Sequence, residues 1–163
     1  MQFYSTNRKT SPVSLREAVV RGLAADRGLF MPEVIRRVPP AFYQNMKEMT
    51  LREISFVVAE AFFGEDVEAG KLKEIVDETL NFDIPLVQVA DNRYSLELFH
   101  GPTLAFKDVG ARFMARLLAY FNKQEGERQV NVLVATSGDT GSAVANGFLD
   151  VPGVKAVSYT HLT

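Results

Sequence analysis

Lys107 is a candidate for chemistry because it lies in an apolar stretch at the head of an amphipathic helix. Its neighbours Leu104, Ala105 and Phe106 are apolar, so partial burial of the amine is expected. Burial lowers the pKa of a lysine and yields the free amine, which can attack an aldehyde to form a Schiff base. The helix dipole does not explain this position, since it favours cations at the other end. The alternative is a surface lysine that pairs with Asp108.

Residues 136–141, which read TSGDTG, form the second candidate site. They follow an apolar, β-branched run and precede a helix, so their backbone N–H groups suit a carboxylate or phosphate. In an open α/β sheet, ligands bind outside the carboxyl ends of the strands. Gly138 and Gly141 would let the backbone approach such a ligand closely. The alternative is that Ser137 or Asp139 simply caps the helix.

The composition excludes several other kinds of function. The 163 residues are 47% hydrophobic and 23% charged, which is typical of one soluble globular domain. A net charge of -2 without a basic block argues against nucleic acid or membrane as a partner. The chain has no cysteine, and its two histidines, His100 and His161, form no cluster, so no metal site is expected. It shows neither a signal peptide nor a membrane span, so a cytoplasmic location is expected.

The elements up to about residue 80 predict a helical unit that follows one short strand at residues 2–6. Each predicted helix has its own signals: a capping box at residues 14–17 and a stop at Gly22, a capping box at residues 50–53 and a stop at Gly64, and a cap at Asp66 before residues 67–80. No residue of this unit is an evident candidate for chemistry.

The pattern changes after Pro85. Two strands flank an Asp-Asn turn, a helix covers about residues 107–122, and a buried strand runs into the TSGDTG segment. A second helix to about residue 149 and a strand at VKAV follow. Alternation of strand, loop and helix predicts a parallel α/β sheet from about residue 85 onward.

Three segments resemble the threonine synthase family, whose members are pyridoxal-phosphate enzymes of the tryptophan-synthase-β-like (type II) fold. They are ELFHGPTLAFKD around Lys107, ATSGDTGSA some thirty residues later, and GL..DRGLFMPE at residues 22–33. The resemblance covers residues 1–157. It implies an α/β fold class, with a helical N-terminal region followed by part of a parallel sheet domain of the type II pyridoxal-phosphate fold.

The resemblance also assigns roles to individual residues. Lys107 is expected to hold pyridoxal 5'-phosphate covalently and then to move protons as a general acid and base. Asp139 stands where many type II enzymes carry an asparagine that faces the hydroxyl of the cofactor ring. An ionised aspartate can only accept a hydrogen bond there, whereas asparagine can also donate. The residues expected to grip the substrate carboxylate are Ser137, Gly138, Thr140 and Gly141.

The implied reaction converts O-phosphohomoserine and water to threonine and phosphate, the last step of threonine biosynthesis. One alternative is a phospholyase that acts on the same small-molecule substrate and yields a keto acid. Another is a non-catalytic module in which the SGDTG segment binds an anion and Lys107 only adds charge.

The resemblance divides the chain into a helical region at 1–81, a partial sheet domain at 82–157 and a tail at 158–163. The tail, within VSYTHLT, is expected to be non-native because it resembles translated adapter sequence. The alternative is a divergent strand end, since Val, Tyr and Thr suit strands. The family also needs a second glycine-rich loop for the cofactor phosphate, which these residues do not contain. The chain alone is therefore expected to be inactive.

Overall fold

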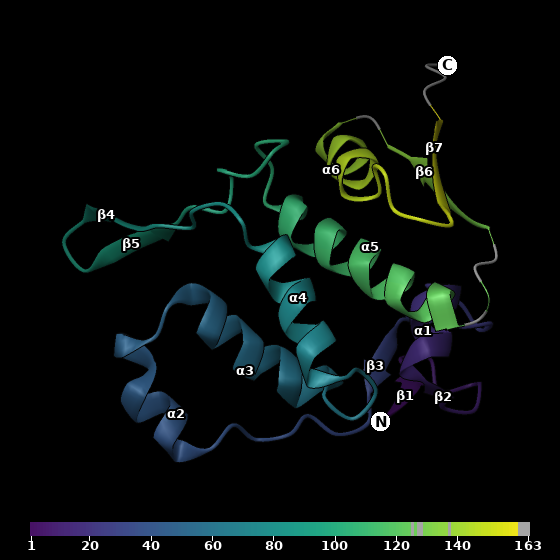
Figure 1. Cartoon of the computed structure of the whole chain (residues 1–163), viewed down its shortest axis with the longest axis horizontal. Helices are drawn as coiled ribbons and strands as arrows, with labels where there is room; N and C mark the ends of the chain where they lie inside the picture. The colour runs from purple at the N-terminus through teal and green to yellow at the C-terminus, as the bar shows by residue number, and fades with distance from the viewer. Residues whose placement is uncertain (125, 127–128, 137, 160–163) are drawn as a thin grey trace. The chain divides into compact units, whose positions relative to one another are not determined.

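A computed structural model describes residues 1–124, 126, 129–136 and 138–159 (Figure 1). The chain forms two compact units, Met1–Asp77 and Glu78–Thr163. The predicted boundary between residues 81 and 82 stays a prediction.

The first unit combines a small antiparallel sheet with four helices. Its strands are β1 (Gln2–Ser5), β2 (Val13–Ser14) and β3 (Phe30–Pro32), in the order β2-β1-β3. Its helices are α1 (Leu15–Arg21), α2 (Pro40–Asn45), α3 (Leu51–Phe63) and α4 (Ala69–Thr79), with a 3-10 turn at Met46–Glu48. The last two residues of α4 belong to the second unit. The sequence predicted β1 but neither β2 nor β3, because segments of two and three residues are too short to show alternation.

The predicted starts of α1 and α3 are confirmed, and so are their predicted stops at Gly22 and Gly64. Thr50 and Glu53 form a complete capping box at the start of α3. Ser14 caps α1 by accepting a hydrogen bond from the amide of Glu17 at 3.2 Å, while the Glu17 side chain pairs with Arg21 instead of closing the box.

Asp26 organises the loop between α1 and β3, where the sequence reads DRG. Its carboxylate accepts hydrogen bonds from the Ser5 hydroxyl at 2.6 Å and from the amides of Gly28 and Lys9. The Ser5 hydrogen bond, more than any other contact, lowers the pKa of Asp26. Gly28 is buried here, and a Cβ atom on it would lie 2.8 Å from the amide nitrogen of Asn7. The segment at residues 22–33, one of the three that resemble a known family, therefore serves the fold of the first unit.

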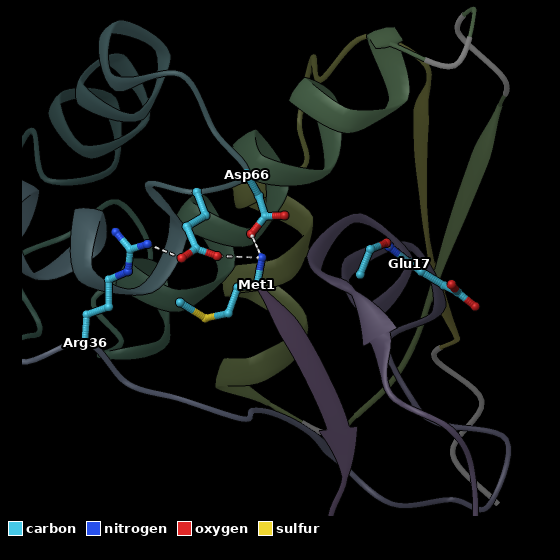
Figure 2. Close-up of polar contacts among 6 residues, drawn as sticks. Met1, Glu17, Arg36 and Asp66 are labelled. Carbon is cyan, nitrogen blue, oxygen red and sulfur yellow. Dashed lines mark hydrogen bonds and ion pairs between the residues drawn. The ribbon is translucent and has the colours of Figure 1, made fainter.

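The prediction that Asp66 caps the third helix is wrong. Helix α4 begins at Ala69, and Asp66 instead accepts a hydrogen bond from the Met1 amine at 3.0 Å (Figure 2). Glu65 pairs with the same amine at 3.0 Å and also with Arg36. Hydrogen bonds to Glu65 and then Asp66 raise the pKa of the Met1 amine above its ordinary value of 8.0. The amine and then Arg36 lower the pKa of Glu65 below 4.5.

We expect these ion pairs to stabilise the first unit only within a window of pH. A raised amine pKa adds stability below pH 8.0 that is lost as pH rises through the raised pKa. A lowered carboxyl pKa adds stability above pH 4.5 that is lost as pH falls through the lowered pKa. Glu65→Gln should therefore lower Tm most between those two values, and less at about pH 3 or about pH 10. Thermal melting across pH measures this difference.

Glu48→Gln is the matched control, because it removes one negative charge from an exposed residue of the same unit. A Tm difference between Glu65→Gln and the parent chain that does not change with pH would contradict the prediction.

The second unit contains an antiparallel hairpin and a parallel pair of strands. Strands β4 (Leu86–Ala90) and β5 (Arg93–Leu96) form the hairpin, and the predicted Asp-Asn turn is confirmed with Asn92 at φ 56°. Helix α5 (Lys107–Gln124) is followed by β6 (Val130–Ala135), α6 (Asp139–Gly147) and β7 (Val154–Tyr159). Strands β6 and β7 pair in parallel, as the alternation of elements predicted.

Strand β6 is less buried than its apolar sequence indicated. Its residues alternate between half-buried and exposed, and Leu133 is 79% exposed. The sheet has only β6 and β7 among the described residues, and the exposed residues at alternate positions of β6 mark a face that is open to solvent. At its end, Ser158 and Tyr159 continue β7 opposite Val134 and Ala135, and the rest of the predicted tail lies outside the described residues.

Candidate active site

Lys107 is the first residue of α5, as the sequence predicted. Its side chain is half-buried, and its Nζ atom lies 4.4 Å from the centroid of the Phe106 ring. Ring faces attract cations at this distance. The apolar neighbours do not enclose the amine, because Leu104 is 75% and Phe106 is 60% exposed while only Ala105 is buried. The amine is therefore accessible to a ligand from the surface.

Asp108 is fully buried and does not pair with Lys107, so the alternative of a surface ion pair is wrong. Its carboxylate accepts two hydrogen bonds from Thr103, one from the amide at 2.9 Å and one from the hydroxyl at 2.5 Å. In the sequence, Asp108 stood out only as a possible partner for the lysine. The pattern that could have revealed its role is a threonine just after the Gly-Pro turn and five residues before a carboxylate in the first turn of a helix.

The turn that leads into α5 is closed by these contacts and by the backbone. The amide of Leu104 donates to the Gly101 carbonyl at 3.1 Å, and that of Asp108 donates to the Ala105 carbonyl at 3.0 Å. Leu104 has φ 57°, a left-handed conformation that is unfavourable for leucine. A Cβ atom on Gly101 would lie 2.6 Å from Asp108 Oδ2, so only glycine fits there.

Arg112 joins α5 to residues 78–81, which begin the second unit. Its Nη2 atom donates to the Glu78 carbonyl at 2.7 Å and to Asn81 Oδ1 at 2.8 Å, and its Nε atom donates to the Thr79 carbonyl at 3.3 Å. The last carbonyls of a helix lack partners within the helix, so the guanidinium group satisfies them. Burial lowers the pKa of Arg112. This contact orients the helix that carries Lys107.

The second predicted segment forms the start of α6. Gly138 is the N-cap and Asp139 is the first residue of the helix, so among the described residues no side chain caps it and the alternative in which Asp139 caps the helix is wrong. Ser137 lies outside the described residues. Asp139 is exposed and Thr140 is half-buried. The amides of Asp139 and Thr140, in the first turn, have no acceptor within the helix and are available to an anion.

The two glycines of this turn differ in their surroundings. A Cβ atom on Gly138 would meet no atom within 4 Å, so its backbone borders open space. A Cβ atom on Gly141 would lie 2.7 Å from Thr136 Cγ2. Gly141 is therefore required for packing inside the turn, whereas Gly138 fits the predicted close approach of a ligand.

Helices α5 and α6 contact each other closely at Gly147, where a Cβ atom would lie 3.0 Å from the carbonyl carbon of Ala111. Gly147 is at the C-terminal end of α6, and Gly138 lies roughly 13 Å away along the helix axis. The structure thus brings together the two helices that carry the candidate residues. Among the described residues, no recorded contact joins Lys107 directly to the turn at residues 138–141.

The described residues offer two separate groups for ligands, an amine at the start of α5 and an open first turn of α6. The accessible amine of Lys107 suits an aldehyde, and the open first turn of α6 suits an anion. No group of acidic or histidine side chains within the described part of the chain could hold a metal ion. Likewise, no helix there is long and apolar enough to cross a membrane.

Comparisons with known proteins agree on one family. A family profile described as "Threonine synthase N terminus" matches residues 2–80. The chain is 40% identical to a threonine synthase of Serratia marcescens over 157 residues, which are 96% of this chain and 36% of that protein. A threonine synthase of Saccharomyces cerevisiae is 38% identical over 90% of this chain and 32% of its own length. The chain thus spans about a third of these relatives.

Solved structures give the same result for the fold. The crystal structure of threonine synthase from Escherichia coli is similar with a TM-score of 0.87 and 38% identity, over 97% of this chain and 36% of that one. A structure of threonine synthase with bound pyridoxal phosphate, from Brucella melitensis, has a TM-score of 0.90 and 33% identity, over 97% of this chain and 35% of that one. The predicted α/β fold class is confirmed.

Proposed function

We propose that the chain is the N-terminal portion of a threonine synthase and that it supplies the cofactor-binding lysine of this pyridoxal-phosphate-dependent lyase. The full-length protein would convert O-phosphohomoserine and water to threonine and phosphate. The observation that carries this proposal is the accessible amine of Lys107 at the start of α5, within a segment that resembles the family's lysine segment.

Bound pyridoxal phosphate acts as an electron sink that stabilises negative charge next to the substrate nitrogen. Lys107 would hold the cofactor through its Nζ atom and afterwards carry protons to and from the substrate at that atom. Residues Ser137, Gly138, Thr140 and Gly141 would bind the substrate carboxylate, aided by the open first turn of α6. Asp139, which is exposed at the start of α6, would face the cofactor.

The proposal extends to the context in which the protein works. We infer a small-molecule substrate and no nucleic-acid or membrane partner, in line with a net charge of -2. We also infer a cytoplasmic enzyme. Residues 1–81 would be the helical region, residues 82–157 the partial sheet domain and residues 158–163 the non-native tail.

We infer further that these 163 residues do not complete the reaction alone. The glycines of the first unit are isolated in the sequence, so they form no second loop for the cofactor phosphate. Charge-assisted hydrogen bonds to such a phosphate contribute about 1.5–3 kcal/mol each. Losing several of them weakens cofactor binding by orders of magnitude.

Covalent labelling of the full-length protein tests the proposed function. Incubation with pyridoxal phosphate followed by borohydride reduction should attach the cofactor to Lys107, and peptide mapping locates the label. Lys123, near the other end of α5 and exposed, is the internal control and should stay unlabelled. Label on another lysine would reject Lys107, and absence of cofactor-dependent label would favour the non-catalytic anion-binding module.

A further inference from the structure

The buried carboxylate of Asp108 serves no role in the function proposed above. It is 0% exposed, although transfer of a carboxylate from water is costly unless hydrogen bonds compensate it. The compensation comes from Thr103, through its amide at 2.9 Å and its hydroxyl at 2.5 Å. No ion pair with Asp108 is found in the described part of the chain. An apolar residue would fill the space at lower cost, so the carboxylate has another use.

Its position indicates that use. The two hydrogen bonds span residues 103–108 and therefore enclose the turn whose last residue before Asp108 is Lys107. Within the turn, Leu104 is held at φ 57°, which leucine rarely adopts unless surrounding contacts impose it. Release of Thr103 would let the turn relax and would redirect the lysine.

The second turn of α5 supports the same arrangement. Arg112 lies one helical turn after Asp108. Burial has the largest effect on the pKa of Arg112 and lowers it, whereas the negative charge of Asp108 raises it. Arg112 is itself fixed to Glu78, Thr79 and Asn81. The start of α5 is thus held on one side by Thr103 and on the other by residues 78–81 of the same unit.

We propose that Asp108 and Thr103 are positioning residues that fix the direction of the Lys107 amine. This rests on the proposed function, because it assumes that Lys107 binds the cofactor. Neither residue touches a reacting atom. They hold the turn so that the amine points toward the ligand before the ligand arrives, which lowers the cost of reaching the reactive geometry.

The chemistry of the pair predicts which substitutions are tolerated. The side-chain carbonyl of asparagine at position 108 can accept a hydrogen bond from the Thr103 amide, and its NH2 group can donate one to the Thr103 hydroxyl. Asp108→Asn should therefore retain most of the arrangement, and Asp108→Ala should lose both hydrogen bonds. Thr103→Val removes only the hydroxyl, whereas Thr103→Ser keeps it. Asp83→Asn and Asp83→Ala are matched controls at an exposed aspartate nearby.

The first test measures how firmly the turn before α5 is held and does not depend on enzyme activity. Hydrogen exchange of the Thr103 and Leu104 amides is followed in the full-length protein that also carries Lys107→Ala. Asp108→Ala should speed exchange at both amides about tenfold, the loss expected for one hydrogen bond to a charged group. Asp108→Asn and both Asp83 variants should leave exchange within about twofold. Unchanged exchange in Asp108→Ala would overturn the inference, whatever the role of Lys107.

The second test measures the consequence for the reaction. In the full-length enzyme, Asp108→Ala should lower kcat roughly a hundredfold and Thr103→Val about tenfold, with KM within about threefold, because misplacement affects the reacting atom more than substrate binding. Asp108→Asn and Thr103→Ser should restore most of kcat. If Asp108→Ala does not fold, Thr103→Val decides. An unchanged kcat in Thr103→Val would overturn the inference, and so would a loss in KM alone.

Discussion

Lys107→Ala in the full-length protein is expected to abolish threonine formation without unfolding the protein. The substitution removes the only group in this segment that can bind an aldehyde covalently, so kcat should fall roughly a thousandfold or more. The side chain is only half-buried, and its recorded contact is the Phe106 ring. Such a contact contributes about 0.5–1 kcal/mol at exposed sites, so Tm should change little. Phosphate release from O-phosphohomoserine and thermal melting give the two measurements.

Two matched variants make the result specific. Lys107→Arg keeps a cation above the Phe106 ring but has no free amine, because arginine stays protonated, so it should be as inactive as alanine. Lys123→Ala, near the other end of the same helix, should keep full activity. Turnover by Lys107→Ala within tenfold of the parent enzyme would assign the covalent role to another residue.

The start of α5 could be predicted from the sequence because its signals are local. The Gly-Pro turn, the apolar spacing and the first turn with Asp108 all lie within a few residues of Lys107, and helix formation depends on such neighbours. The same holds for the capping box of Thr50 and Glu53, in which both hydrogen bonds join residues three apart. Periodicity after Pro85 likewise gave the hairpin and the parallel pair.

Contacts between distant residues explain what the sequence did not show. Asp66 has the spacing of a helix cap, yet it binds the Met1 amine, sixty-five residues away in sequence. Tertiary pairing thus overrode a local preference, and α4 begins later than predicted. Strands β2 and β3 exist because β1 offers both of its edges to them, which two or three residues cannot reveal by themselves.

The sequence singled out residue types that could do chemistry, but it did not show their supporting contacts. Lys107 and the glycines of the SGDTG segment have recognisable spacing, whereas the burial of Asp108 depends on how the chain folds back at Thr103. Gly141 was expected to face a ligand because glycine permits close approach. A Cβ atom there would also lie 2.7 Å from Thr136 Cγ2, and a sequence does not reveal which neighbour a glycine approaches.

The glycines of this turn give the second large effect, because they separate ligand binding from folding. Gly138 has φ -169°, an extended conformation that any residue adopts, and a Cβ atom on it would meet open space. Gly138→Val should therefore fold normally while its side chain keeps a carboxylate away from the first turn of α6. Loss of one or more hydrogen bonds to a charged group should raise the KM for O-phosphohomoserine about tenfold to a hundredfold. Bound cofactor should largely remain.

Gly141 provides the contrast within the same turn. Gly141→Ala places a Cβ atom 2.7 Å from Thr136 Cγ2, so it should destabilise the protein by about 1–3 kcal/mol through overpacking. Thr136→Ser deletes that methyl group but keeps the hydroxyl, which accepts a hydrogen bond from the Gly138 amide at 3.4 Å. The double variant should therefore recover most of the lost Tm, since the two residues are coupled by one contact. Unchanged KM in Gly138→Val, or no recovery in the double variant, would show that these glycines have other roles.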